Sequence, residues 1–304
     1  ISLKRVIQSK KEAWLHAVRL RTLPLALASI FAGSFLAYWQ ETFRWEVLGL
    51  ASLTTVFLQI LSNLSNDYGD SVHGADSSAR KGPIRAVQSG LISLPEMKRA
   101  MIFLGLLSLI SGVLLIYLSL PNWSYFLGFL AIGLLAIWAA IRYTSGSNPY
   151  GYAGLGDISV FLFFGLVGVS GTFFLHSLNA DPIILLIACS LGCFSTAVLN
   201  INNIRDIDSD QLAGKRSIPV RIGRSKAIAY HWTLIAVGYG CMLAFVGLNQ
   251  AYGSLLSLII LPWMVLIGRG IQQAATAAET DPYLKQMAIS TLGWTILFGI
   301  GLIL

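Results

Sequence analysis

Nine long apolar runs constrain the fold of this chain more than any other feature of its sequence. Each is close to the length of about 20 residues that a helix needs to cross the hydrocarbon core of a bilayer. Of the 304 residues, 55% are hydrophobic and only 12% are charged, which is typical of chains that cross a membrane repeatedly. We therefore predict an all-α integral membrane protein with about nine transmembrane helices. The runs cover residues 22–39, 46–62, 100–120, 125–141, 155–176, 182–199, 227–247, 253–268 and 286–304.

The positions of the 21 lysines and arginines predict how these helices are oriented. Twenty lie in the amino-terminal segment and in every second link between the runs, and the intervening links hold only Arg44. Positive residues accumulate on the cytoplasmic side of a membrane. We therefore expect the amino terminus and the basic links to face the cytoplasm, with the chain in a bacterial inner or plasma membrane. Topology and anionic lipid account for the net charge of +7, so no nucleic-acid partner is expected.

Two long basic links share one layout, in which asparagines come first, spaced aspartates follow and cations come last. Residues 63–86 read NLSNDYGDSVHGADSSARKGPIRA, and residues 200–217 read NINNIRDIDSDQLAGKRS. Four predicted helices separate them, which suggests two similar halves that each contribute one acidic loop to a central cavity. No linker divides the chain, so we expect residues 1–304 to form a single membrane domain whose cytoplasmic loops cap this cavity.

The acidic residues of the first link are spaced to share one face of a helix. Asn63, Asp67 and Asp70 fall at positions i, i+4 and i+7, so they form a stripe if the second helix continues through them. Asp76 lies beyond Gly74 and has to fold back to join them. Any one of these aspartates alone is most simply a solvated loop residue, and the repetition in the second link is what argues for a site.

The second link places Asn202, Asp206 and Asp210 at positions i, i+4 and i+8, whereas Asp208 points away from this face. Like charges so close together repel one another unless a cation lies between them. Carboxylates, waters and substrate phosphates are the ligands that Mg²⁺ takes in proteins. The sequence therefore predicts a magnesium site whose ligands are Asp67, Asp70, Asp76, Asp206 and Asp210.

Basic and carboxamide side chains flank both acidic groups. Arginine grips phosphate oxygens with a two-pronged fork and lysine acts as a point charge, so these residues suit a phosphate-bearing ligand. Asparagines near the headgroups also cap helix ends, and this alternative is strongest for Asn202. The predicted phosphate-binding residues are Asn66, Lys81, Arg85, Asn203, Lys215 and Arg216.

A third link on the same side contains Tyr143, Tyr150 and Tyr152. A single tyrosine at a membrane interface is ordinarily a belt residue. Three electron-rich rings beside both acidic links are also suited to line a pocket for an aromatic molecule or to face a carbocation. Asp157 follows them at a position where we expect it to cap the fifth helix.

The two acidic links resemble the motifs of the UbiA-type intramembrane prenyltransferase superfamily, whose members have nine transmembrane helices. Asn66, Asp67 and Asp70 match its NDxxDxxxD-like first motif, and Asp206 and Asp210 match its DxxxD-like second motif. The segments RTLPLALAS, NDYGDSVHGAD, YGYAGLGD and NNIRDIDSDQLAGKRS are similar to the 1,4-dihydroxy-2-naphthoate branch of menaquinone biosynthesis. The resemblance therefore covers almost the whole chain.

Two positions depart from the pattern of the superfamily. Gly74 stands where the first motif expects a further aspartate, which this chain supplies two residues later as Asp76. Asn203 stands where other members often have the first aspartate of the second motif. This leaves one carboxylate fewer for a second metal ion and keeps Asp208 open as a ligand.

The resemblance implies transfer of a polyprenyl group from polyprenyl diphosphate to 1,4-dihydroxy-2-naphthoate, with loss of diphosphate and CO₂, to give demethylmenaquinone. Membrane lipid holds the long tail, while two Mg²⁺ ions and nearby cations neutralise the diphosphate as the allylic C–O bond ionises. The implied catalytic residues are Asp67, Asp70, Asp206 and Asp210. The residues expected at the acceptor are Arg21, Arg142, Tyr143 and Tyr150, and whether Arg21, Arg142 or Arg205 binds its carboxylate stays open.

Other functions also stay open from the sequence. The same fold and chemistry can serve another aromatic acceptor, such as 4-hydroxybenzoate, homogentisate, haem or a chlorin. Carboxylates inside membranes also mark ion paths, so a cation transporter is an alternative, although no predicted span holds a carboxylate near its centre. A membrane scaffold is the remaining alternative, and it leaves the paired acidic and basic groups without explanation.

Overall fold

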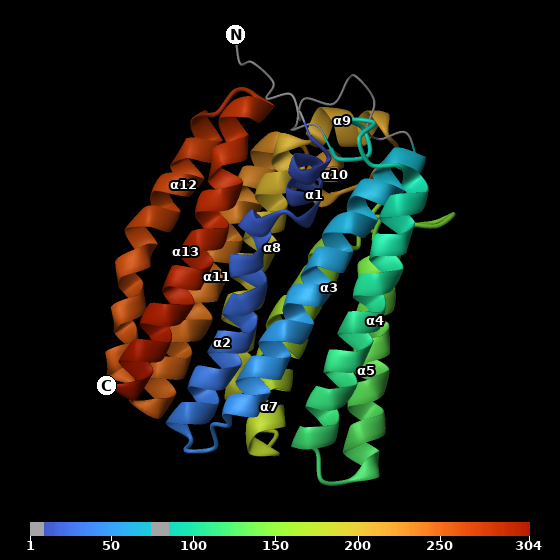
Figure 1. The fold of residues 1–304 in the computed structure, drawn as a ribbon. Coiled ribbons are helices and arrows are strands. Elements are labelled where there is room, and N and C mark those ends of the chain that lie inside the picture. The colour runs from blue at the N-terminus through green and yellow to red at the C-terminus, as the bar shows by residue number, and fades with distance from the viewer. Residues whose placement is uncertain (1–8, 74–84) are drawn as a thin grey trace.

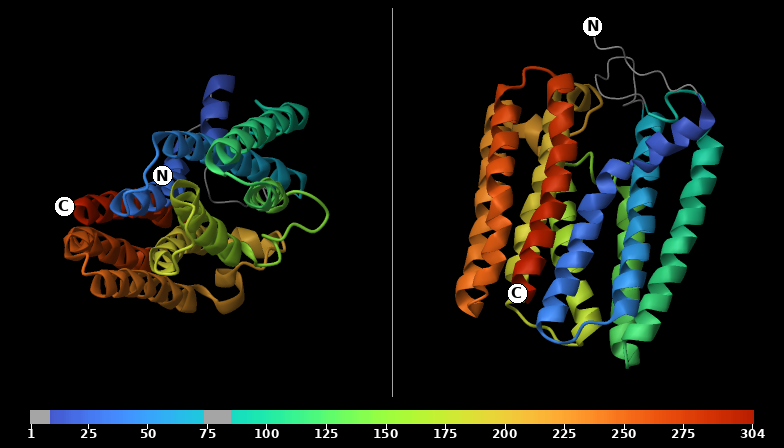
Figure 2. Two further views of the ribbon diagram at one scale, coloured as in Figure 1. Left: turned by 90° about the horizontal axis from the view of Figure 1, so that it is seen from below. Right: turned by 60° about the vertical axis from the view of Figure 1, so that its left-hand side comes forward.

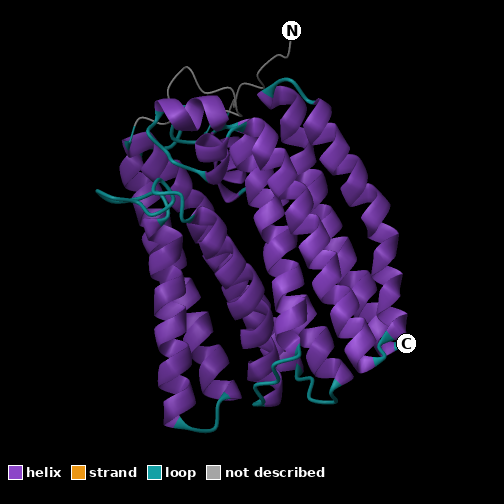
Figure 3. Cartoon of the chain, turned by 180° about the vertical axis from the view of Figure 1, so that it is seen from behind, coloured by secondary structure: helices purple, strands orange, loops and turns teal. Residues whose placement is uncertain are grey.

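Long helices that run side by side make up the structure, a computed structural model that describes residues 9–73 and 85–304 (Figure 1). Within these residues the chain forms helices and loops and contains no strand (Figure 3). Nine helices or helix combinations in this described part are long and apolar enough to cross a membrane. The predicted all-α membrane fold with nine spans is therefore confirmed.

The first four spans use the amino-terminal half of the chain. α1 and α2 form the first span, with the short turn η1 between them, and α3, α4 and α5 form one span each. The bounds are α1 Lys10–Val18, η1 Leu20–Thr22, α2 Leu23–Trp39, α3 Trp45–Val72, α4 Leu94–Ser119 and α5 Trp123–Arg142.

The other five spans include two that are built from several pieces. α6, η2 and α7 form one span, in which η2 has the wider turns of a π-helix, and η3 and α12 form another. The bounds are α6 Gly156–Val160, η2 Phe161–Gly171, α7 Thr172–Ser177, α8 Ile184–Arg205, α9 Ile207–Leu212, α10 Ile218–Ile222, α11 Arg224–Asn249, η3 Tyr252–Ile260, α12 Leu261–Gln273 and α13 Ala277–Ile303.

α8 lies in the middle of the packed part of the bundle. It packs against α11, η2 and α13, and its Phe194 meets Trp294 of α13 edge to face with ring centroids 5.0 Å apart. α2 also packs along α13, so the first and last spans lie side by side (Figure 2). The burial of these large rings holds α13 against α8, the helix that leads to the second acidic segment.

The carboxyl-terminal end of α3 extends well beyond its apolar run and carries the first acidic stripe. Asn63, Asp67 and Asp70 are all buried on it, so the helix does continue through them as the spacing requires. The loop after α5 crosses close to this end, where the Thr144 hydroxyl donates to the Ser65 carbonyl at 2.9 Å. A side chain at Gly69 would collide with the Thr144 carbonyl, so glycine allows this close approach.

The second acidic segment differs from the single helix face that the spacing predicts. α8 ends at Arg205, the chain turns at Asp206, and α9 begins at Ile207. The amide of Asp210 still bonds the carbonyl of Asp206 at 2.8 Å, so the four-residue spacing survives across the break. α9 lies with α1 and α10 at one end of the bundle, above the end of α3 (Figure 1).

Replacing Gly69 with alanine tests this close approach. We expect Gly69→Ala to lower the stability of the purified protein by about 1–3 kcal/mol, because the added methyl group pushes the 144 loop away. Gly49→Ala on the same helix is the matched control, since no atom lies within 4 Å of its added Cβ. Thermal denaturation in detergent measures both variants, and equal midpoints would show that the approach is not tight.

Candidate active site

A polar cavity of about 430 Å³ lies where the two acidic segments meet. Its walls come from the end of α3, the loops after α5 and α9, the junction of α8 and α9, and α1. The structure therefore brings together most of the acidic, basic and asparagine residues that the sequence assigns to one site. The predicted residues that line it are Arg21, Asn66, Asp67, Asp70, Arg85, Tyr143, Asn203, Asp206, Asp210 and Lys215.

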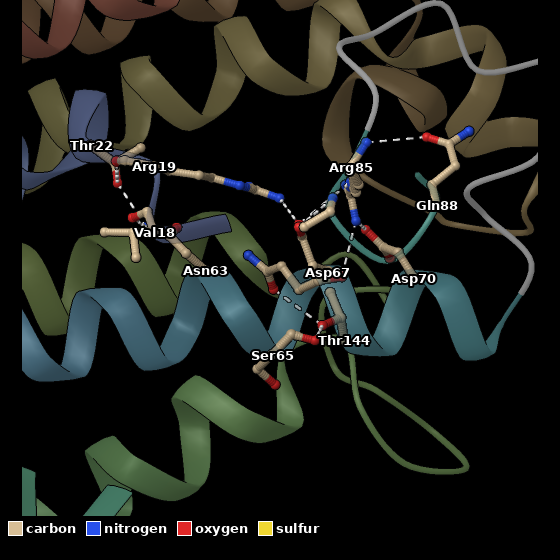
Figure 4. A network of polar contacts seen from close by, with 12 residues as sticks. Val18, Arg19, Thr22, Asn63, Ser65, Asp67, Asp70, Arg85, Gln88 and Thr144 are labelled. Atoms are coloured by element: carbon tan, nitrogen blue, oxygen red, sulfur yellow. Dashed lines mark hydrogen bonds and ion pairs between the residues drawn. The ribbon is translucent and has the colours of Figure 1, made fainter. Parts of the chain in front are cut away.

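Asp67 on α3 is enclosed by cations from two different segments. Its side chain is only 2% exposed, and Arg19 donates to its Oδ1 at 2.5 Å. The guanidinium of Arg85 lies 3.9 Å away, and Figure 4 shows both arginines directed at this carboxylate. Arg19 itself adopts a left-handed backbone conformation, with φ of 51°, where α1 meets η1. This uncommon geometry for a residue with a side chain aims the arginine inward from the chain's first helix.

Asp70 connects the first acidic segment to the second. It pairs with Arg85 from its own link, and Lys215 from the second link lies 3.1 Å from its Oδ1. Tyr152 donates to the same oxygen at 2.7 Å. Lys215 also stands over the Tyr152 ring, 4.8 Å from the centroid, so one tyrosine contacts both the acidic and the basic partner. Burial and the adjacent Asp70 raise the pKa of Tyr152, which keeps its hydroxyl a donor.

The two aspartates of the second segment have different surroundings. Arg205 grips both oxygens of Asp206, with Nε to Oδ1 at 2.8 Å and Nη2 to Oδ2 at 2.6 Å. Among the described cations, Asp210 pairs with Lys215 alone, at the longer distance of 3.5 Å. Burial, followed by the nearby Asp206 and Asp70, raises the pKa of Asp210 to about 6 despite the opposing effect of Lys215. Asp210 is therefore a buried carboxylate that its surroundings favour in the protonated form.

These carboxylates suit a divalent cation whose coordination is completed by a second ligand. No three acidic, histidine or cysteine side chains in the described residues already converge on one point. Mg²⁺ characteristically binds through one or two carboxylates together with waters and substrate phosphates, and does not require an all-protein cage. Burial, and after it the nearby Asp206 and Asp70, raises the pKa of Asp210, and a cation bound beside its carboxylate would offset both effects. The residues present therefore suit Mg²⁺ shared with a phosphate-bearing ligand.

A second cavity of about 860 Å³ joins the first and is predominantly apolar. It runs between α2, α3, α4, α5 and η2, and it reaches Asp181 in the link at the opposite end of the bundle. Arg19, Arg21 and Tyr143 line both cavities, so the polar cavity and the apolar one meet at these side chains. The site can therefore hold a molecule with an anionic head and a long apolar tail.

Asparagine and tyrosine residues support the walls of the site. Asn63 donates to the Val18 carbonyl at 2.9 Å and to the Thr22 hydroxyl at 3.0 Å, so it fixes the turn between α1 and α2. Asn66 accepts from the Thr144 hydroxyl at 3.1 Å. Tyr150 lines the apolar cavity.

Several predicted residues are not among the described residues that line the polar cavity. Asp76 and Lys81 lie outside the described residues. Arg216 and Asp208 are exposed, and Arg142 is not among the described residues that line either cavity. The expectation that Asp157 caps the fifth helix is wrong. No described side chain caps α6, and Asp157 is buried in the wall of the polar cavity.

Three features of the site were not predicted from the sequence. They are Arg19, the hydrogen bond from Tyr152 to Asp70, and Asp281. Asp281 begins the last span and contacts Arg205 at 2.6 Å and Arg21 at 3.4 Å. Unpaired charges directly beside apolar runs are the signal that could have found Arg19 and Asp281, because a charge there needs a partner.

Known proteins resemble this chain in sequence and in fold. The model of the UbiA prenyltransferase family matches residues 26–298. A 1,4-dihydroxy-2-naphthoate octaprenyltransferase of Haemophilus influenzae is 43% identical over 99% of both chains, and one of Escherichia coli is 42% identical over 97% of this chain and 96% of that one.

Solved structures share the fold. A UbiA homolog from Aeropyrum pernix superposes with a TM-score of 0.67 at 18% identity, covering 94% of this chain and 98% of that one. One from Archaeoglobus fulgidus bound to GPP and Mg²⁺ gives 0.63 at 15% identity, covering 94% and 99%.

The raised pKa of Asp210 predicts a pH-dependent stability. A carboxyl whose pKa is raised in the folded state destabilises the fold when it ionises, so its cost grows as pH rises from 3.8 to about 6 and is complete above about 6. In metal-free detergent solution at pH 7.5, we expect Asp210→Asn to be more stable than the parent by about 2–3 kcal/mol. This advantage should shrink as pH falls towards 4.5. Paired thermal denaturation curves measure it, and a difference that does not vary with pH would contradict the assignment.

Proposed function

Because the chain belongs to the UbiA prenyltransferase family, we propose that it transfers a polyprenyl group from polyprenyl diphosphate to 1,4-dihydroxy-2-naphthoate. The products are diphosphate, CO₂ and the quinol form of demethylmenaquinone, which places the reaction in menaquinone biosynthesis. The observation that carries this proposal is the junction of a polar, acidic cavity with a long apolar one. The relatives that are 42–43% identical, which are named for this reaction, support the choice of acceptor.

The polar cavity is proposed to hold the diphosphate end of the donor. Mg²⁺, when bound, supplies charge neutralisation for the leaving diphosphate. We assign the four buried aspartates to two such ions, with Asp76 as a further ligand. Arg85 and Lys215 then exchange their carboxylate contacts for phosphate oxygens. The remaining members of the proposed diphosphate site are Asn66, Lys81, Asn203 and Arg216.

The apolar cavity is proposed to hold the prenyl tail beside the aromatic acceptor. Tyr143 lines both cavities, and Tyr150 lines the apolar one. At the junction the allylic C–O bond breaks, and its electron pair leaves with the diphosphate. A ring carbon of the acceptor forms the new C–C bond. The bond to the carboxyl group then breaks, returns its electron pair to the ring and releases CO₂.

The positive charge on one side of the bundle supports a cytoplasmic position for the polar cavity. Twenty of the 21 lysines and arginines belong to that side. We propose that the protein lies in the inner membrane with this cavity facing the cytoplasm. Water-soluble diphosphate then leaves to the aqueous side, whereas the prenylated product stays in lipid.

The first test is an acceptor panel with purified protein. Octaprenyl diphosphate, the donor suggested by the names of the relatives, is incubated with Mg²⁺ and with either 1,4-dihydroxy-2-naphthoate or 4-hydroxybenzoate. We expect a decarboxylated prenyl naphthoquinol by mass spectrometry, and none when a chelator is added. Prenylated hydroxybenzoate alone would overturn the acceptor, and no product with either would contradict the reaction.

The buried aspartates provide the second test. We expect Asp67→Asn and Asp206→Asn each to reduce turnover by at least about 100-fold, because each loses a charge that stabilises the leaving group. Asp208→Asn is the matched control, since this exposed aspartate of the same segment is not among the described residues of the polar cavity. Initial rates at saturating donor measure all three. Near-parental turnover of either buried variant in a folded sample would remove that aspartate from the site.

A further inference from the structure

We infer that Arg21 binds the carboxylate of the acceptor and that Asp281 is the resident counter-ion that this carboxylate displaces. The inference rests on the proposed function, because it requires an acceptor that carries a carboxylate. It also separates the arginines that the sequence leaves as equal candidates for this role.

Two of the three candidate arginines have no fork available at the junction of the cavities. Arg142 donates to the Asn148 carbonyl at 3.5 Å and is not among the described residues that line either cavity. Arg205 lines the polar cavity but is almost fully buried, and each of its nitrogens already donates to Asp206, Asn202 or Asp281. Binding a ligand through Arg205 would therefore break a complete set of buried bonds.

Arg21 has the position and the exposure that binding an anionic ligand requires. It belongs to η1, lines both cavities and retains 32% of its side-chain exposure. Within the described residues, its guanidinium has one side-chain partner, Asp281, at 3.4 Å. The next residue of η1, Thr22, accepts hydrogen bonds from Asn63 and Gln59, which hold this turn in place. A guanidinium fork on a fixed turn suits a planar carboxylate.

Asp281 shows that a carboxylate can already approach Arg21. One of its oxygens takes a hydrogen bond from Arg205 at 2.6 Å, and the other points to Arg21 at 3.4 Å. The stronger contact with Arg205 holds Asp281 back, so its contact with Arg21 is long. Asp281 therefore balances the charge of Arg21 without filling its fork. An incoming carboxylate can replace this weak contact and leave the Arg205 pair in place.

This position agrees with the chemistry of the acceptor. Arg21 lies where the polar and apolar cavities meet, which is where the first carbon of a bound prenyl chain must lie if its diphosphate occupies the polar cavity. A carboxylate held there directs its ring towards that carbon. Once CO₂ has left, the product has no group to bind the fork, so the same contact that positions the substrate does not retain the product.

The test separates acceptor binding from donor binding by steady-state kinetics on the full-length protein. We expect Arg21→Gln to raise the KM for 1,4-dihydroxy-2-naphthoate roughly 10-fold to 100-fold, as expected for a lost charged hydrogen bond. The KM for the prenyl diphosphate should change less than about twofold. Arg21→Lys keeps the charge without the fork and should fall between the parent and Arg21→Gln. Asp281→Asn should lower the acceptor KM about twofold to fivefold, because it removes a weak competitor.

Two inhibitors distinguish binding of the carboxylate from a general structural role. 1-Hydroxy-2-naphthoate and 1-naphthol differ by the carboxyl group, and we expect the parent to prefer the first. Arg21→Gln should abolish this preference, whereas the exposed Arg269→Gln is the matched control that should retain it. An unchanged preference in Arg21→Gln, an increased donor KM alone, or loss of the preference in Arg142→Gln would overturn the inference. If the parent protein prenylates no naphthoate, the proposed function is contradicted instead. This result concerns the parent alone, so it is distinguishable from every result obtained with the variants.

Discussion

The buried carboxylates at the carboxyl-terminal end of α3 need charged partners, and the rest of the site supplies them. Asp67 and Asp70 are almost fully enclosed, and a charge removed from water needs partners close at hand. Arg19, Arg85 and Lys215 supply them from three separate segments. The fold therefore brings the start of the chain and both acidic links to one place.

The two cavities divide the work of the proposed reaction between two kinds of surface. Carboxylates and cations line the smaller one, and mainly apolar side chains line the larger one. The helices that enclose the larger cavity are those of a membrane bundle, whereas the ends of α3 and α8 build the smaller one together with turns and short helices. The charged residues are consequently concentrated at one end of the bundle, where the long helices hold them in position.

The sequence predicts the periodic parts of this structure and misses the contacts made over long distances. Apolar runs identify the nine spans, and the spacing of Asn63, Asp67 and Asp70 correctly predicts their shared face. The helix break at Asp206 is missed because the sequence shows only that Asp206 and Asp210 are four residues apart. A continuous helix and a turn that keeps the same backbone hydrogen bond both fit this spacing. The pairing of Arg21 with Asp281 is missed because 260 positions separate them, and only the packing of α2 along α13 brings them together.

The meeting of the two cavities has a consequence for how matter moves through the protein. A substrate with an ionic head and a hydrocarbon tail can keep its head in polar surroundings and its tail in apolar surroundings while it is bound. The boundary between polar and apolar surroundings therefore lies inside the protein, at the side chains of Arg19, Arg21 and Tyr143. Cleavage at that boundary yields one fragment on each side of it. Products are therefore sorted by solubility at the moment they form, without a separate transport step.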